Sequence, residues 1–150
     1  LTFETEIISD TAPLNDLIRS VLSASKNVHV MRDPTRGGVA STLKEIALSA
    51  QVGIEIDEKE IPIKEEVKGA CEILGFDPLY IANEGKVIIF AAKEDEEKIL
   101  SVMRTHQFGK ESCVVGKVVK EHAVIVVMKT LIGSTRVVEM ITGEQLPRIC

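Results

Sequence analysis

The chain has 150 residues and a formal net charge of -5, with 45% hydrophobic, 27% charged and only 3% aromatic residues. This length supports one domain with a hydrophobic core, and the apolar content excludes a largely disordered chain. The acidic balance and the few aromatic residues argue against a nucleic-acid surface; with no apolar run long enough to span a membrane and no visible signal peptide, we expect a cytoplasmic protein.

The first half of the chain alternates helix and strand patterns. The predicted elements are a helix at 13–24, a strand at 27–31, a helix at 39–50, a strand at 53–57 and a helix at 64–74. The helices show apolar residues at helical spacing, the first begins at Pro13, and Gly75 ends the third. Short apolar segments separate them, so this half predicts alternating helices and strands.

The second half is richer in strands. The predicted elements are a strand at 87–92, a helix at 94–106 and strands at 112–119, 123–128 and 135–140. The continuous apolar run at 87–92 predicts a fully buried strand in a central sheet position. Alternating elements followed by consecutive strands predict an α+β fold, an α/β sandwich with a mixed β-sheet and helices mainly on one face.

The first candidate site is the segment Asp33-Pro34-Thr35-Arg36-Gly37-Gly38, between a predicted strand and a predicted helix. Glycines let the backbone approach a ligand, and N–H groups at a helix N-terminus can bind an anion, to which Arg36 adds positive charge. The spacing is neither that of a P-loop nor that of a dinucleotide fingerprint. The alternative is a capped helix start, with Asp33 or Thr35 as N-cap.

The second candidate site is Ala82-Asn83-Glu84-Gly85, just before the predicted buried strand. A carboxylate at this junction can act as a base or orient an amide nitrogen. The alternative is a plain turn, in which Asn83 and Gly85 supply the backbone conformations.

The three cysteines form no CxxC pair, which favours a reducing compartment, and the histidines lack metal-ligand spacing. Cys71 and Cys113 are expected to be buried, inert core thiols. Cys150 is the last residue of a tail, 143–150, that spans on the order of 25 Å when extended and can carry a thiol to another active site. The alternative is an incidental cysteine in a frayed end.

Segments 33–38, 82–85 and 147–150 (Pro-Arg-Ile-Cys), taken together, resemble the HypE family of hydrogenase expression/formation proteins, and the similarity extends over the whole chain. The first two also resemble the wider aminoimidazole ribonucleotide synthetase (AIR synthase) superfamily, whose members use ATP to phosphorylate an amide-type oxygen or a related group. The resemblance implies an AIR synthase-related C-terminal domain at 1–142, with 1–12 leading into it from another domain, and a flexible tail at 143–150.

The resemblance also implies an activity. In such proteins a carbamoyltransferase, HypF, carbamoylates the terminal cysteine, here Cys150; ATP drives dehydration of the thiocarboxamide to a thiocyanate, and the cyano group passes to iron held by HypC and HypD. Glu84 is then the base or amide-orienting residue. The residues expected at the nucleotide are Asp33, Thr35, Arg36, Gly37, Gly38 and Asn83.

Nothing in the chain resembles the family's N-terminal domain, which implies a piece of a longer protein. That domain is expected to supply the dimer interface and most ligands of ATP and Mg²⁺, so the isolated 150 residues are expected to be inactive. One alternative is a kinase or synthetase of the thiamine-monophosphate kinase or selenophosphate synthetase type with an incidental terminal cysteine. The other is a docking module without chemistry of its own.

Overall fold

The structure, a computed structural model, describes residues 9–140. The elements are α1 (Asn15–Ala24), β1 (Val28–Arg32), α2 (Gly38–Ala50), β2 (Gly53–Asp57), α3 (Glu65–Leu74), the 3-10 turn η2 (Pro78–Tyr80), β3 (Ile88–Ala91), α4 (Glu96–Thr105), β4 (Gly116–Val119), β5 (Val126–Lys129) and β6 (Thr135–Val138), with further short 3-10 turns at Glu58–Glu60 and Lys93–Asp95. The predicted α+β class is confirmed, and the predicted helices agree with the observed ones to within about two residues at either end.

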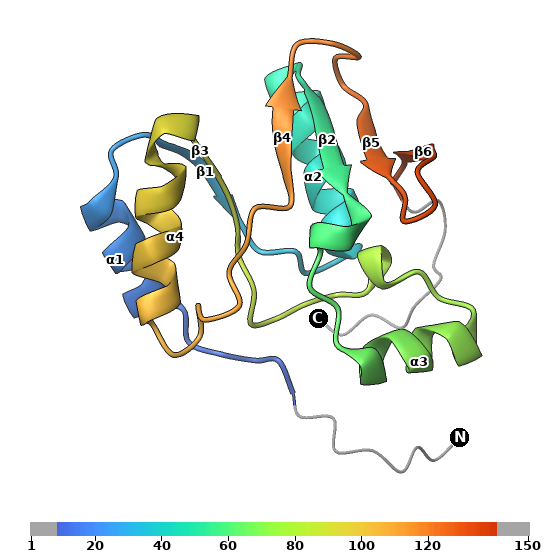
Figure 1. The fold of residues 1–150 in the computed structure, drawn as a ribbon, viewed down its shortest axis with the longest axis horizontal. Helices are drawn as coiled ribbons and strands as arrows, with labels where there is room; N and C mark the ends of the chain where they lie inside the picture. The colour runs from blue at the N-terminus through green and yellow to red at the C-terminus, as the bar shows by residue number, and fades with distance from the viewer. Residues whose placement is uncertain (1–8, 141–150) are drawn as a thin grey trace.

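The strands form two sheets (Figure 1). The larger sheet has the order β4-β2-β5-β6. In it β2 is parallel to β5, whereas the β2–β4 and β5–β6 pairs are antiparallel, so this sheet is mixed as predicted. The smaller is an antiparallel pair of β1 and β3, beside which α1 and α4 lie against each other.

The core lies between α2 and one face of the larger sheet. Apolar residues alternate along β2 and β5, because successive side chains of a strand point to opposite faces. The buried members of this cluster are Ala40, Leu43, Ile46, Ala47, Ile54, Ile56, Leu79, Val126, Met128 and Val138. Each large apolar side chain buried here contributes about 1.5–3 kcal/mol, so this layer anchors the N-terminal end of α2, where the first candidate site ends.

The central position predicted for 87–92 is wrong. Among the described strands, β3 pairs only with β1, and all of its residues are half-buried. Ile88 and Phe90 pack against the α2 core cluster, and the alternating residues Ile89 and Ala91 point to the other face. Because both faces of β3 are partly covered, its apolar run is continuous, as it is in a central strand.

The prediction that Cys113 is a buried residue of a strand is also wrong. β4 begins only at Gly116, so Cys113 lies in the preceding loop, where its half-buried thiol donates a hydrogen bond to the Glu60 carbonyl at 3.2 Å. Cys71 is buried on α3, as predicted. Burial raises the pKa of both thiols, and nearby Asp77 and Glu60 respectively add to this, which keeps both thiols protonated and unreactive.

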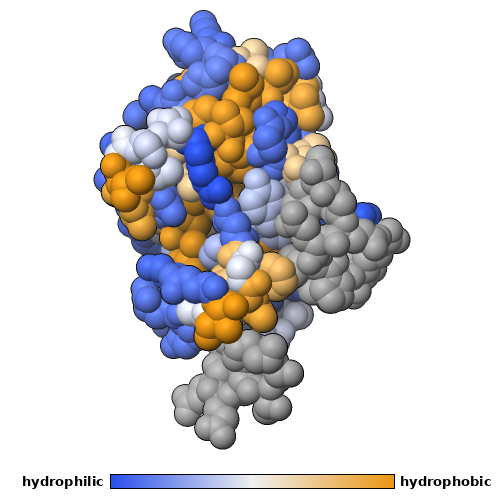
Figure 2. All heavy atoms as spheres, turned by 90° about the vertical axis from the view of Figure 1, so that its right-hand side faces the viewer, coloured by the Kyte–Doolittle hydropathy of each residue, from blue (hydrophilic) through white to orange (hydrophobic). Residues whose placement is uncertain are grey.

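The face that includes β6 and α3 mixes apolar and charged surface (Figure 2). Leu131 and Ile132, in the turn between β5 and β6, are 66% and 90% exposed. No helix within residues 9–140 is long and apolar enough to span a membrane.

Leu43→Ala is expected to lower the free energy of unfolding by about 2–5 kcal/mol, because it leaves a cavity at the centre of the α2 layer. Leu43 is 2% exposed, whereas Ile132 is 90% exposed. Ile132→Ala is therefore the matched control, with an expected change within about 0.5 kcal/mol. Urea titration of both variants measures the difference, and similar losses in the two would contradict the core assignment.

Candidate functional site

The structure brings the two sequence motifs together. The Asn83 N–H donates a hydrogen bond to the Pro34 carbonyl at 3.0 Å, which ties the 82–85 turn to the 33–38 loop. The start of α2 also packs directly on the η2 segment, since a Cβ on Gly38 would lie 2.4 Å from the Leu79 carbonyl oxygen and 2.6 Å from that of Ile81. A glycine at position 38 permits this close approach of the two backbones.

The capped helix start suggested for the first motif is wrong. The N-cap of α2 is Gly37, with φ of 76°, and no side chain caps the helix. The Thr35 carbonyl instead accepts a hydrogen bond from the Gly38 N–H at 2.9 Å. The first N–H groups of a helix have no intrahelical partner, and here no side-chain cap is bonded to them, so this end of α2 can receive an anion. Arg36 is exposed beside it.

The second motif is a turn of a different kind from the one suggested. Neither Asn83 nor Gly85 has a positive φ. The Asn83 side chain folds back to donate to the Ile81 carbonyl at 2.8 Å. A Cβ on Gly85 would lie 1.5 Å from the Asp10 carbonyl oxygen, so this position needs a glycine for close approach of another segment rather than for its dihedral angles.

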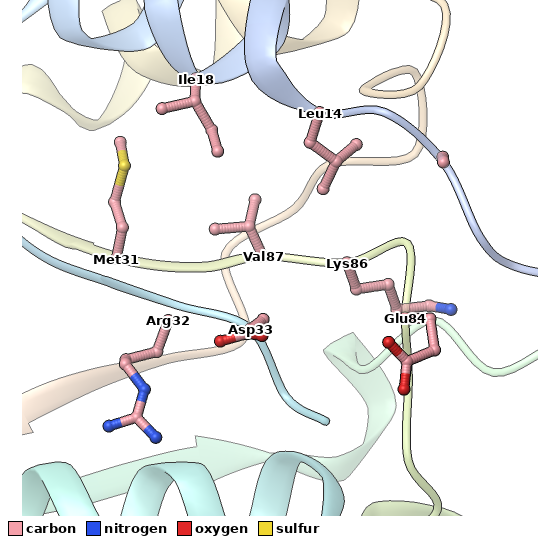
Figure 3. A pocket seen from close by; sticks show the side chains of 9 residues that line it. Leu14, Ile18, Met31, Arg32, Asp33, Glu84, Lys86 and Val87 are labelled. Carbon is pink, nitrogen blue, oxygen red and sulfur yellow. The ribbon is translucent and has the colours of Figure 1, made fainter. Parts of the chain in front are cut away.

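A pocket of about 330 Å³ opens beside both motifs, between α1 and the β1–β3 pair (Figure 3). Its apolar lining residues are Ala12, Leu14, Ile18, Met31 and Val87, and its charged ones are Arg32, Asp33, Glu84 and Lys86. Figure 3 shows the apolar side chains of Leu14, Ile18 and Val87 facing one another across the pocket, while Arg32 and Glu84 point to the other side of the strands. Such a pocket is at the small end of the range for small-molecule sites.

Asp33 and Glu84 both line this cavity, with the Glu84 side chain directed to the face of the strands opposite its apolar part (Figure 3), and Arg36, Gly37 and Gly38 lie at the start of α2. Glu84 is exposed, and within residues 9–140 its carboxylate has no ion pair or hydrogen bond. An exposed carboxylate without such partners can accept a proton from a bound group. Cys150, the proposed carrier, lies outside the described residues.

Sequence reasoning missed Asp10 and Lys86 as site residues. Asp10 had a signal only as a residue preceding the first helix, and its contact with Glu84 spans 74 positions.

Among the described residues, no group of three or more histidine, cysteine or acidic side chains could hold a metal ion.

Comparison with known proteins identifies relatives over the whole chain. The family model described as AIR synthase related protein, C-terminal domain, matches residues 2–129. The protein named Carbamoyl dehydratase HypE of Cupriavidus necator is 48% identical over 150 residues, which is 100% of this chain and 43% of that protein. The chain therefore spans less than half the length of this relative.

Solved structures show the same relationship. The crystal structure of hydrogenase maturation protein HypE in complex with ATP superposes with a TM-score of 0.92 and 40% identity, covering 100% of this chain and 46% of that one. The crystal structure of a HypE–HypF complex gives a TM-score of 0.87 and 44% identity over 93% of this chain and 45% of that one.

Proposed function

We propose that the chain is the C-terminal part of an ATP-dependent carbamoyl dehydratase of [NiFe]-hydrogenase maturation. The chain belongs to the HypE family of AIR synthase related proteins. The observation that carries the proposal is the 48% identity to a carbamoyl dehydratase over all 150 residues. A similarity of fold alone would leave the kinase or synthetase alternative equally open. The sequence identity instead extends over all 150 residues, including the cysteine-terminated tail.

The proposed reaction explains the position of the thiol. The Cys150 sulfur carries a carbamoyl group as a thiocarboxamide, and the γ-phosphate of ATP is transferred to its oxygen. Removal of both N–H protons and departure of phosphate then leave a thiocyanate on sulfur, with ADP and phosphate as products. ATP is needed because phosphate is a good leaving group and a carbonyl oxygen is not. A tail of residues 143–150 is suited to present one sulfur to several sites.

The pocket geometry supports distinct roles for the two motifs. Glu84, which has no ion pair among residues 9–140 and lines the pocket, is the proposed base for an N–H of the thiocarboxamide. The proposed nucleotide contacts are Asp33, Thr35, Arg36, Gly37, Gly38 and Asn83. Gly37 and Gly38 support this assignment because they begin an α2 end that no side chain caps. The Asn83 side-chain amide is engaged with the Ile81 carbonyl and offers its remaining hydrogen-bonding groups.

Magnesium is assigned to the rest of the protein. No cluster of three or more histidine, cysteine or acidic side chains that could hold a metal lies within residues 9–140, and we propose that the N-terminal part of the full-length protein supplies most ligands of the ion. When bound with ATP, the ion would neutralise phosphate charge.

The proposed partners follow from the same family membership. A relative of this chain crystallises with HypF, which supports HypF as the carbamoyl donor. We further propose transfer of the cyano group to iron held by HypC and HypD, and a homodimer of the full-length protein. Because the chemistry needs a free thiol, we place the protein in the reducing cytoplasm.

The proposal is tested on the full-length protein by intact-mass spectrometry. Incubation with HypF, carbamoyl phosphate and ATP is expected to add one carbamoyl group and then remove one water, which leaves the mass of a thiocyanate. Added phosphate that persists on the protein or on a small-molecule acceptor would instead support the kinase alternative.

The 150-residue fragment is expected to fold but to bind ATP only weakly, because it supplies one wall of the nucleotide site. Calorimetric titration with ATP and magnesium measures this, with the full-length protein as the control. Low-micromolar binding by the fragment, about 8 kcal/mol, would show that the domain has a complete site and that the ligand assignment is wrong.

A further inference from the structure

Asp10 makes two polar contacts with the turn that carries Glu84. Its Oδ2 atom accepts a hydrogen bond from the Glu84 backbone N–H at 3.2 Å and another from the Lys86 ammonium at 3.2 Å. One donor belongs to Glu84 itself, and the other lies two residues after it. One carboxylate oxygen therefore holds the backbone of Glu84 and the charge two residues further on.

The backbone of the same segment packs against this turn. A Cβ at Gly85 would lie 1.5 Å from the Asp10 carbonyl oxygen and 3.0 Å from the Ala12 nitrogen. Segment 10–12 therefore crosses directly over Gly85, and the contacts on either side of the crossing are those of Asp10. On the other side, the Asn83 N–H is bonded to Pro34, so the turn is fixed at both of its ends.

The two cations that line the pocket are paired with carboxylates other than that of Glu84. The charged residues lining it are Arg32, Asp33, Glu84 and Lys86. Arg32 is paired with Glu45 at 2.9 Å, and Lys86 with Asp10 at 3.2 Å. Both cations that line the pocket are thus engaged by other carboxylates, and Glu84 has no ion pair within residues 9–140.

We propose that Asp10 is a positioning residue for Glu84: it fixes the backbone of Glu84 and keeps the Lys86 ammonium away from the Glu84 carboxylate. The proposal rests on the role proposed above for Glu84 as a base. A carboxylate that pairs with an ammonium group is held in its ionised form and accepts a proton less readily. Asp10 thereby contributes to dehydration without touching the substrate.

The test uses the full-length protein loaded by HypF and compares Asp10→Ala, Asp10→Asn and the double variant Asp10→Asn/Lys86→Gln. The matched control is Asp16→Asn, another exposed aspartate in an ion pair, with Arg19 on α1. The readouts are carbamoyl loading, the dehydration rate on adding ATP, and the pH dependence of that rate.

Asp10→Ala is expected to load normally and to dehydrate about tenfold more slowly, a typical effect of losing a residue that orients a functional group. Asp10→Asn retains an acceptor for the Glu84 N–H but releases Lys86. Its dehydration is expected to slow, with the acid limb of the pH–rate profile at lower pH, because the freed ammonium favours ionised Glu84. The double variant removes that ammonium and is expected to restore the limb toward the parent position.

Parent-like dehydration in Asp10→Ala would overturn the proposal, and so would a double variant whose profile matches that of Asp10→Asn alone. Hydrogen exchange at the Glu84 amide gives a readout independent of the reaction. Faster exchange in Asp10→Ala, but not in Asp16→Asn, supports the proposed positioning of the Glu84 backbone by Asp10, and unchanged exchange overturns it. If Glu84→Gln leaves dehydration unaffected, the role of Glu84 fails, while the exchange result still decides whether Asp10 holds its backbone.

Discussion

Replacing Cys150 with alanine is expected to abolish carbamoyl loading of the full-length protein. The proposed carrier atom is the sulfur of this residue, and no hydroxyl or amine in an alanine side chain can replace it. Intact-mass spectrometry after incubation with HypF, carbamoyl phosphate and ATP is expected to show the unmodified mass. The sequence predicts a flexible tail at 143–150, so stability should change by no more than about 0.5 kcal/mol.

The matched control is Cys113→Ala, which also removes one thiol. Cys113 is half-buried, bonded to the Glu60 carbonyl, and has a raised pKa because of its burial, with Glu60 adding to the effect, so it should not compete for the carbamoyl group. This control is expected to load like the parent. A carbamoyl group on the Cys150→Ala protein would exclude the terminal thiol as the carrier.

Local patterns were sufficient to predict the helices. The apolar faces of α1, α2 and α4 repeat at helical spacing, and α4 ends at Thr105 with His106 as its C-cap, one residue before the predicted end. The alternation along β2 and β5 likewise follows from one buried face.

Strand partners and caps depend on contacts that are distant in sequence. A continuous apolar run such as that of β3 is expected both for a central strand and for a strand of a two-stranded sheet that is partly covered on both faces. The pairing of β3 with β1 could therefore not be predicted. Asp33 and Thr35 are residue types that cap helices, but α2 uses Gly37 in the left-handed region, where the start of the helix lies close to Leu79 and Ile81.

The candidate site shows the same limit. Its two motifs could be recognised from composition and position, and the hydrogen bond from Asn83 to Pro34 places them side by side. The contact of Asp10 with Glu84 involves an ordinary aspartate far away in the chain, for which no spacing rule exists. Such a contact depends on tertiary geometry, so it could not be predicted from the sequence.

Glu84→Gln is expected to stop the reaction after loading. Glutamine preserves the shape of the side chain and should preserve the backbone contact with Asp10, since that contact uses the Glu84 N–H. It exchanges an acceptor-only carboxylate for an amide that also donates, and so removes the base. Loading on Cys150 should be normal, because the proposed role of Glu84 begins only with deprotonation of the thiocarboxamide.

On adding ATP, the Glu84→Gln protein is expected to dehydrate at least about 100-fold more slowly than the parent, as is typical when a positioned acid–base group is lost. The thiocarboxamide mass should therefore accumulate. Glu111→Gln, at an exposed glutamate in the loop after α4, makes the same chemical change away from the pocket and should react like the parent. If both variants lose water at the parent rate, Glu84 has no role as a base and the 82–85 segment serves only as a turn. If only Glu84→Gln stalls with the carbamoyl group in place, proton removal at this pocket limits the formation of the cyano group.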